Sequence, residues 1–245
     1  MIDLGIIGGT GLTELAGLEI LRREMVATPY GAPSGPLTFG RLHGRDVVFL
    51  ARHGYDHSIP PHRVNYRANL FALRAAGVTR VLAVAAVGGI TAELTPGRLA
   101  FPHQIVDYTW GRAHTLFDEP GAPVTHVDFT TPYTEALRQS LIAAAAAGAI
   151  DAATAGVYGA AQGPRLESAA EVDRMARDGC TMVGMTGMPE AGLARELELA
   201  YACCAVVANR AAGRGGVDIH EEIEQHLRTG MARVKHLLER LLPAL

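Results

Sequence analysis

The sequence of 245 residues contains a single lysine, Lys235, and its formal net charge is −3. Proteins that bind nucleic acids through the phosphate backbone present a basic surface, and this chain has no lysine-rich block or arginine stripe. A Walker loop is also excluded, because it requires Gly-Lys-Ser/Thr and Lys235 lies near the C-terminus. We therefore expect no nucleic-acid partner and no P-loop nucleotide hydrolase.

Cysteine is scarce, and long apolar runs are absent. Cys180, Cys203 and Cys204 have neither metal-site nor disulfide spacing, as is typical of a reducing compartment. No apolar run is long enough to cross a bilayer, and the first residues lack the basic flank and apolar stretch of a signal peptide. These features predict a cytoplasmic protein with no membrane partner.

Groups for covalent or metal-assisted chemistry are also missing. Cys203 and Cys204 lie in an apolar pattern, where thiols serve as packing groups. His53, His57 and His62 are close in sequence, but no cysteine or acidic residue completes a metal-site spacing. None of the four serines lies in a G-x-S-x-G elbow: Ser34, Ser58, Ser140 and Ser168. We expect neither an enzyme nucleophile nor a bound metal.

What the chain does have is a regular alternation of strand and helix patterns, in a sequence that is 49% hydrophobic. No linker or repeat divides it, so we predict one α/β domain spanning residues 1–245. The predicted strands are residues 2–7, 46–51, 81–87, 157–161, 182–185 and 202–208, and the predicted helices are residues 65–76, 132–147, 168–178, 189–198 and 219–241.

Polar or glycine-rich turns follow several of these strands. The first turn fails the dinucleotide fingerprint, because the third glycine position of G-x-G-x-x-G is Glu14. It still places Thr10 where a hydroxyl and backbone N–H groups can hold an anion, although an ordinary turn explains the same residues. Arg52 and His53 after the next strand indicate either a phosphate site or a salt bridge at the rim.

Six motifs follow one another along the chain: Gly8-Gly9-Thr10-Gly11, Arg52-His53-Gly54, Val87-Gly88-Gly89, Gly163-Pro164-Arg165, Gly184-Met185-Thr186-Gly187-Met188-Pro189-Glu190 and the strand that ends at Asn209. In this order they resemble the trimeric purine nucleoside phosphorylase family, and most closely its methylthioadenosine and methylthioinosine phosphorylase branch. The resemblance covers nearly the whole sequence and implies a central twisted mixed β-sheet flanked by helices.

The resemblance implies a reversible phosphorolysis, in which inorganic phosphate attacks C1′ of a purine nucleoside and the base leaves. Phosphate is then a co-substrate, and no cofactor is required. The implied phosphate ligands are Thr10, Arg52, His53, the backbone at Ala86, and Thr186. The implied purine and ribose contacts are Leu166, Glu167, Met185 and Asn209. Of these, Arg52, His53, Glu167 and Asn209 are the implied catalytic residues.

For the 5′ group of the sugar, the resemblance implies a pocket formed by His57, His126 and His220. His126 would come from a neighbouring subunit, which implies a homotrimer with shared active sites. His220 aligns with a histidine that reaches the 5′ hydroxyl in ordinary purine nucleoside phosphorylases, whereas the methylthio branch tends to have an apolar residue there. The Gly-Gly-Thr-Gly and Arg-His-Gly motifs favour the methylthio branch.

The base is predicted from hydrogen-bond polarity. A carboxylate only accepts, so Glu167 suits the N1–H of a 6-oxopurine, and the amide of Asn209 can donate to O6 and N7. The methylthioadenosine phosphorylases have Asp at the Asn209 position and a second Asp where this chain has Ala211. Methylthioinosine is therefore the first prediction and methylthioadenosine the second, with a general 6-oxopurine nucleoside phosphorylase as a further alternative.

Three other classes fit the sequence less well. A nucleosidase, which uses water, would leave Thr10, Arg52 and Thr186 without a role. A non-catalytic nucleoside-binding module would not need phosphate ligands, and a dinucleotide-dependent oxidoreductase would need the fingerprint that fails at Glu14.

Overall fold

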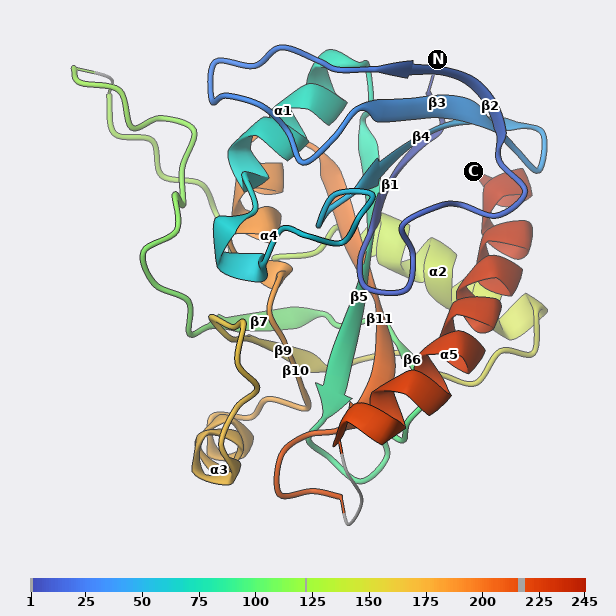
Figure 1. Cartoon of the computed structure of the whole chain (residues 1–245), viewed down its shortest axis with the longest axis vertical. Coiled ribbons are helices and arrows are strands. Elements are labelled where there is room, and N and C mark those ends of the chain that lie inside the picture. The colour runs from blue at the N-terminus through green and yellow to red at the C-terminus, as the bar shows by residue number, and fades with distance from the viewer. Residues whose placement is uncertain (1, 122, 216–218) are drawn as a thin grey trace.

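The apolar runs of the sequence assemble into one mixed β-sheet at the centre of the molecule (Figure 1). The computed structural model describes residues 2–121, 123–215 and 219–245. Within these ranges the sheet has eleven strands: β1 (Leu4–Gly8), β2 (Glu19–Glu24), β3 (Leu37–Leu42), β4 (Arg45–Ala51), β5 (Arg80–Gly89), β6 (Leu99–Ala100), β7 (Gln104–Asp107), β8 (Ala152–Ala153), β9 (Val157–Ala160), β10 (Met182–Gly184) and β11 (Ala200–Arg210).

Strand β5 pairs with three other strands of the sheet, β1, β10 and β11. One edge pairs in parallel with β11 from Arg80 to Gly89. The other edge pairs with β1 through Val81–Ala83 and with β10 through Gly88–Gly89. Strands β1 and β10 therefore leave the same edge of β5 at different points, and the sheet divides between them.

Both faces of the sheet are covered by helices, so successive residues of a strand enter two different cores. Helices α1 (Tyr66–Ala75) and α4 (Gly187–Glu196) cover one face, where Ile7 and Ala83 are buried. Helices α2 (Glu135–Ala147) and α5 (Ile219–Leu241) cover the other face, where Ile6 and Leu82 are buried. The predicted α/β fold with a mixed central sheet flanked by helices is confirmed.

Two helices begin at side-chain caps that the sequence indicates. The Asn65 side chain accepts a hydrogen bond from the Ala68 N–H at 3.1 Å, at the start of α1. Ser168 and Glu171 form a reciprocal capping box at the start of α3 (Ala169–Arg177). These caps fix both helix starts within one residue of the predicted boundaries. Two short 3₁₀ helices, η1 (Pro61–Arg63) and η2 (Leu242–Ala244), complete the described helical elements.

The five strands β2, β3, β6, β7 and β8 were not predicted. Strand β2 lies at the edge of the sheet, and all six of its residues are exposed, so it lacks the apolar alternation that indicates a strand. Strands β6 and β8 have two residues each, too few for any periodicity. Pairing to a neighbour, rather than the local sequence, determines these elements.

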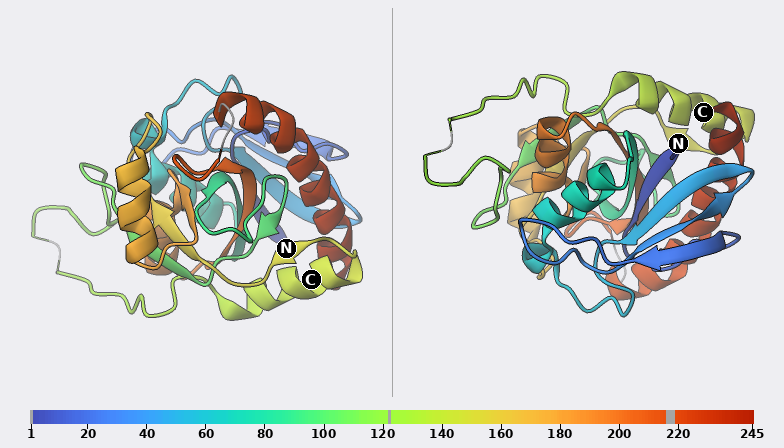
Figure 2. Two further views of the ribbon diagram at one scale, coloured as in Figure 1. Left: turned by 90° about the horizontal axis from the view of Figure 1, so that it is seen from below. Right: turned by 90° about the horizontal axis from the view of Figure 1, so that it is seen from above.

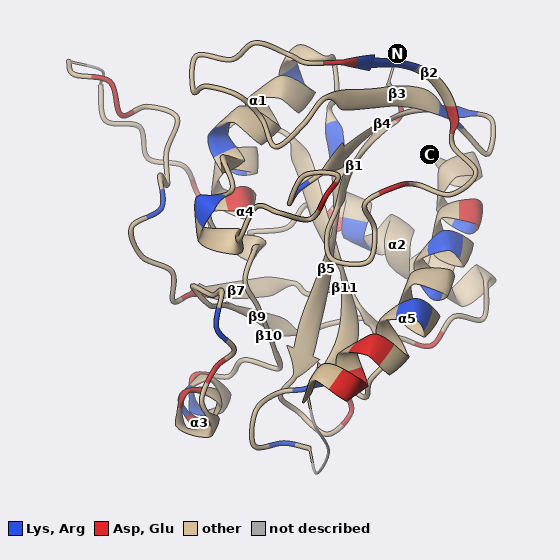
Figure 3. Cartoon of the chain, in the orientation of Figure 1, with Lys and Arg blue, Asp and Glu red and all other residues tan. Residues whose placement is uncertain are grey.

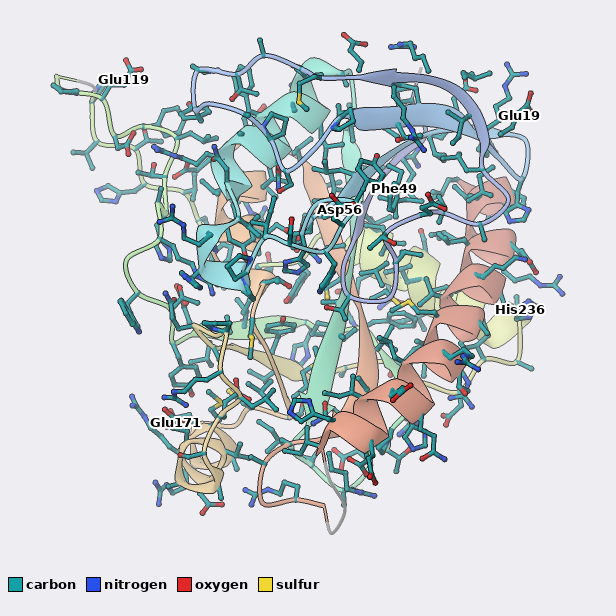
Figure 4. All side chains as sticks on the ribbon, in the orientation of Figure 1. Glu19, Phe49, Asp56, Glu119, Glu171 and His236 are labelled. Carbon is teal, nitrogen blue, oxygen red and sulfur yellow. The ribbon has the colours of Figure 1, made fainter. Side chains whose placement is uncertain are left out.

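A long segment between β7 and α2 stands away from the body of the molecule in both views of Figure 2. Figure 4 shows Glu119 at its outer end. Acidic and basic residues are spread over several elements, including β2, α1, α3 and α5 (Figure 3). No helix in the described part of the chain is long and apolar enough to cross a membrane.

Candidate active site

The division of the sheet opens a cavity against the middle of β5. Ala85–Gly88 form its floor, between the pairing of β5 with β1 and its pairing with β10. The turn after β1 contributes Gly9 and Thr10, and the turn after β10 contributes Met185 and Thr186. The cavity has a volume of about 340 Å³ and lies at a branch point of the sheet, where α/β folds bind small ligands.

Most of the predicted site residues line this one cavity. Those that line it are Thr10, Arg52, His53, His57, Ala86, Leu166, Glu167, Met185, Thr186 and Asn209. They come from the turns after β1, β4 and β10, from the strands β5 and β11 themselves, and from the segment after β9, so residues separated by up to 199 positions in the sequence meet here. His126 and His220 do not line the cavity.

Three polar side chains gather at the end of the cavity nearest β1. The Thr10 hydroxyl oxygen lies 3.5 Å from His57 Nε2, and the rings of His57 and His53 are 4.9 Å apart between centroids. A Cβ at Gly9 would lie 2.6 Å from the Val84 carbonyl oxygen, so only glycine lets the turn approach β5 this closely. This end of the cavity offers hydrogen-bonding groups for a small anion.

His53 is neutral at physiological pH. Burial and the neighbouring charge of Arg52 lower its pKa to about 4. Its Nδ1 lies 2.8 Å from the Ile59 carbonyl oxygen, and because a carbonyl only accepts, Nδ1 carries the proton. The other ring nitrogen, Nε2, is then a hydrogen-bond acceptor, which suits a protonated anion such as hydrogen phosphate.

Arg52 is held by a buried ion pair. Its Nε and Nη2 donate to the two carboxylate oxygens of Glu190 at 2.6 and 2.8 Å, and its Nη1 donates to the Val84 carbonyl at 2.9 Å. Tyr201 donates its hydroxyl to Glu190 at 2.8 Å, and the Arg52 and Glu190 side chains are each 1% exposed. The planar fork that we expected to face phosphate therefore faces Glu190, and only the two remaining N–H groups of Arg52 are left for a ligand.

Thr186 is placed by the tight packing of the turn after β10. A Cβ at Gly184 would lie 2.1 Å from the Tyr158 hydroxyl, so this glycine allows Tyr158 to sit beneath the turn. The Thr186 N–H donates to the same hydroxyl at 3.4 Å. Thr186 is itself buried and lines the cavity together with Met185.

Glu167 lies in the segment after β9 and Asn209 lies near the end of β11, and both line the cavity. The register of β11 shifts by one residue between Val207 and Asn209, and such a bulge redirects a side chain. Asn209 donates one amide N–H to the Arg210 carbonyl at 2.7 Å, which leaves a second N–H. Burial raises the pKa of the Glu167 carboxyl, the behaviour of an acid enclosed in a cavity.

The first turns of α5 form an apolar wall. Ile219 and Ile223 are four residues apart, so they lie on one face of the helix, and both line the cavity. One turn further on, Leu227 packs against Gly11, where a Cβ would lie 2.9 Å from two of its carbons. The wall is therefore continuous with the turn that carries Thr10.

Two of the predicted 5′-pocket residues lie outside the cavity within this subunit: His220, and His126, which was predicted to come from a neighbouring subunit. His220 is exposed, because it lies one residue after Ile219 and so points about 100° away around the helix. His126 is exposed on the projecting segment between β7 and α2. His57, Ile219 and Ile223 do line the cavity.

Sequence reasoning did not assign roles to the two isoleucines, nor to Tyr158. It also gave Glu190 no partner, although this residue lies in a quoted motif. The i, i+4 spacing of Ile219 and Ile223 was a usable signal, but only with the helix orientation known. Nothing in the sequence indicates that Tyr158 would lie beneath Gly184.

The described residues provide neither a metal-binding cluster nor a reactive thiol in the core. Among them, no three His, Cys, Asp or Glu side chains are close enough to hold a metal ion. Burial raises the pKa of the Cys203 thiol to about 12 and that of Cys204 well above its usual value. Both thiols are neutral packing groups.

The fold is that of an α/β protein whose cavity at β5 combines polar side chains with an apolar wall. The chain belongs to the Phosphorylase superfamily, which it matches over residues 3–243.

Known proteins align with all or most of the chain. It is 57% identical over all 245 residues to a probable S-methyl-5'-thioinosine phosphorylase of Pseudomonas syringae pv. tomato, covering 100% of each protein. It is 44% identical to a 6-oxopurine nucleoside phosphorylase of Pyrococcus furiosus, covering 91% of this chain and 85% of that protein. The methylthioadenosine phosphorylase from Schistosoma mansoni, in complex with adenine, superposes with a TM-score of 0.92 at 32% identity, covering 100% of this chain and 92% of the other.

The buried ion pair gives a stability prediction. Glu190→Gln leaves Arg52 charged and buried without a carboxylate, so we expect the free energy of unfolding to fall by about 3–5 kcal/mol. Glu24→Gln breaks the exposed pair with Arg22 and is the matched control, with an expected loss below about 1 kcal/mol. Urea unfolding at one protein concentration measures both. Equal losses in the two variants would contradict the prediction.

Proposed function

We propose that this protein catalyses the phosphorolysis of S-methyl-5'-thioinosine, giving hypoxanthine and 5-methylthioribose 1-phosphate. The observation that carries the proposal is the composition of the cavity at β5. It joins a polar anion site at Thr10 and His53 to the carboxylate and amide of Glu167 and Asn209, and an apolar wall from α5 closes one side. The name of the Pseudomonas syringae relative agrees with this assignment.

The anion site suits hydrogen phosphate. The Thr10 hydroxyl, the two remaining N–H groups of Arg52 and the backbone near Ala86 and Thr186 supply donors, and the neutral His53 accepts a hydrogen bond from the phosphate P–OH group. Because Glu190 neutralises Arg52, this part of the site relies on directed hydrogen bonds more than on net positive charge.

In the proposed reaction, a phosphate oxygen forms a bond to C1′ while the bond from C1′ to the purine N9 breaks. The electron pair of that bond goes to the purine, and positive charge develops on the ribose ring. The protein contributes by holding phosphate in position and by donating a hydrogen bond from Asn209 to the purine as its negative charge grows. Phosphate is a co-substrate here, and we propose no cofactor.

Base selection follows from hydrogen-bond polarity at Glu167. As a carboxylate it accepts the N1–H of hypoxanthine, whereas the N1 of adenine is an acceptor and would face it without a proton. A mispaired buried polar group costs about 1–3 kcal/mol, which corresponds to roughly a tenfold to hundredfold preference. The proposal therefore places methylthioinosine ahead of methylthioadenosine.

The apolar wall supports a thioether at the 5′ position. Ile219 and Ile223 stand next to the Thr10 and His57 end of the cavity, and the exposed His220 is not available in this subunit to bind a 5′ hydroxyl. A methylthio group removed from water by these side chains gains about 0.8 kcal/mol for each buried methylene-sized group. Inosine lacks this contribution.

The proposed assembly is a homotrimer with shared active sites, to which His126 contributes from a neighbouring subunit. Its support is the projecting segment, where His126 is exposed together with the apolar side chains of Trp110, Phe117 and Val124. A cytoplasmic location is also proposed, and the three free cysteines are its support.

A substrate panel tests the proposed function directly. We expect rapid release of hypoxanthine from methylthioinosine only when phosphate is present, with slower cleavage of methylthioadenosine and inosine. Liquid chromatography of the products, with and without phosphate, measures this. Cleavage without phosphate would indicate a nucleosidase, and a higher kcat/KM for methylthioadenosine or inosine would contradict the choice of substrate.

The raised pKa of Glu167 predicts an acid limit of activity. Burial raises this pKa above its usual value of 4.5, so as the pH falls through the raised value the carboxyl becomes protonated and can no longer accept N1–H. We expect kcat/KM for methylthioinosine to fall on the acid side at a pH above 4.5.

Glu167→Gln is the control for this pH profile. It should lower kcat/KM at neutral pH and shift the acid limb down toward the His53 pKa of about 4. An unchanged acid limb in Glu167→Gln would show that another group titrates.

The apolar wall makes a separate prediction about the 5′ group. Ile223→Thr replaces an apolar side chain of the wall by a smaller one that carries a hydroxyl, so the kcat/KM ratio of methylthioinosine to inosine should fall about tenfold, equivalent to about 1.4 kcal/mol. Ile20→Thr, on the exposed strand β2, is the control and should leave the ratio unchanged. A ratio in Ile223→Thr equal to that of the wild type would place the 5′ group elsewhere.

A further inference from the structure

Arg112 lies behind the cavity, between the two turns that form its sugar and base sides. It comes from the segment that follows β7 and is not itself a lining residue. Its side chain is largely buried, with Arg112 as a whole 9% exposed. Sequence reasoning gave it no role.

On the sugar side, Arg112 holds the turn after β10. Its Nη1 donates to the Met185 carbonyl at 2.8 Å, to the Met188 carbonyl at 2.6 Å and to the Tyr66 hydroxyl at 3.3 Å. Met185 is the residue predicted to pack on the ribose, and Thr186 follows it directly. Arg112 therefore fixes the backbone that presents both side chains to the cavity.

On the base side, Arg112 holds the segment after β9. Its Nη2 donates to the Gln162 carbonyl at 2.7 Å and to the Ala161 carbonyl at 3.3 Å, and its Nε donates to the Gln162 side-chain oxygen at 3.2 Å. Gln162 begins the segment that leads to Leu166 and Glu167 at the cavity. One planar guanidinium group thus joins the two sides of the nucleoside site.

This pattern of partners differs from that of the other two buried arginines. Arg52 pairs with Glu190, and Arg138 pairs with Glu135, whereas within the described ranges no carboxylate lies within 4.0 Å of Arg112. The five N–H groups of Arg112 are directed at six neutral oxygens, of which three belong to residues 161–162 after β9 and two to residues 185 and 188, in the turn after β10 and the start of α4. Hydrogen bonds to these oxygens fix the positions of the two backbone segments relative to each other.

The position of Arg112 is itself fixed by its own segment. The Trp110 N–H donates to the Gln162 side-chain oxygen at 3.1 Å. A few residues later, the Leu116 N–H donates to the Glu196 carboxylate at 2.7 Å, at the end of α4. The guanidinium group is therefore presented from a segment anchored on both sides of it.

We propose that Arg112 is a positioning residue for the nucleoside: it sets the distance between the Met185–Thr186 turn and the Gln162–Glu167 segment. This inference rests on the proposed function, since it assumes that these two sides bind sugar and base. Of the predicted phosphate ligands, Thr186 lies in the turn that Arg112 holds, whereas Thr10, Arg52, His53 and Ala86 belong to elements to which Arg112 donates no hydrogen bond. We therefore expect the loss of Arg112 to weaken nucleoside binding more than phosphate binding.

The test compares Arg112→Ala with Arg138→Ala. Arg138 is 8% exposed and, besides its ion pair with Glu135, donates to the Phe101 and Thr154 carbonyls. It therefore matches Arg112 in burial and in its bonds to backbone carbonyls, but none of these residues lines the cavity. We expect Arg112→Ala to raise the KM for nucleoside and to lower kcat/KM about 100-fold, with a smaller change in the KM for phosphate. Arg138→Ala should lower the melting temperature and leave both KM values unchanged. Added guanidinium ion should restore part of the activity of Arg112→Ala.

Arg112→Lys keeps the proposal testable if the alanine variant does not fold. Lysine keeps the positive charge and a long side chain, so we expect this variant to fold. Its single ammonium group cannot bridge both sides as a planar guanidinium group does, so the nucleoside KM should still be raised. A nucleoside KM equal to that of the wild type in Arg112→Lys would overturn the proposal, as would equal kinetic effects of Arg112→Ala and Arg138→Ala.

Calorimetric binding of hypoxanthine separates a failure of the proposed function from a failure of the positioning role of Arg112. If wild-type protein binds hypoxanthine but cleaves no nucleoside, the proposed function fails, and weaker hypoxanthine binding by Arg112→Lys still supports the positioning role.

Discussion

The pairing of Arg52 with Glu190 is the interaction on which the site depends. Removing two charges from water is costly, and the cost is offset here by two short hydrogen bonds between the ions, one to the Val84 carbonyl and one from Tyr201. These four residues belong to the end of β4, to β5, to α4 and to β11. The network therefore fixes the elements around the cavity floor before any ligand binds.

The second constraint is the division of the sheet at β5. Because β1 and β10 leave the same edge of β5 at different points, backbone in the middle of the strand faces a cavity instead of another strand. Glycines at positions 9 and 184 then allow the flanking turns to approach more closely than any other residue would. Sheet topology creates the space, and small residues determine how tightly its walls close.

Much of this arrangement could be predicted from the sequence. Thr10, His53 and Glu167 follow short apolar strands in a distinctive order, so both their elements and their meeting place were predictable. His220 was not, since on a helix a shift of one residue turns a side chain through about 100° and decides between cavity and solvent. The direction of the Arg52 fork was also unpredictable, because its partner Glu190 lies 138 residues away and only the fold brings the two together.

The surfaces that contact the two ends of the proposed substrate belong to different parts of the chain. The wall proposed to lie beside the 5′ group is one face of α5, whereas the proposed base contacts come from the segment after β9 and from the bulge of β11. A substitution on the helix can alter one end of the ligand without disturbing the other. The architecture therefore allows descendants of one ancestral enzyme to change sugar preference and base preference in separate evolutionary steps, while the anion site stays the same.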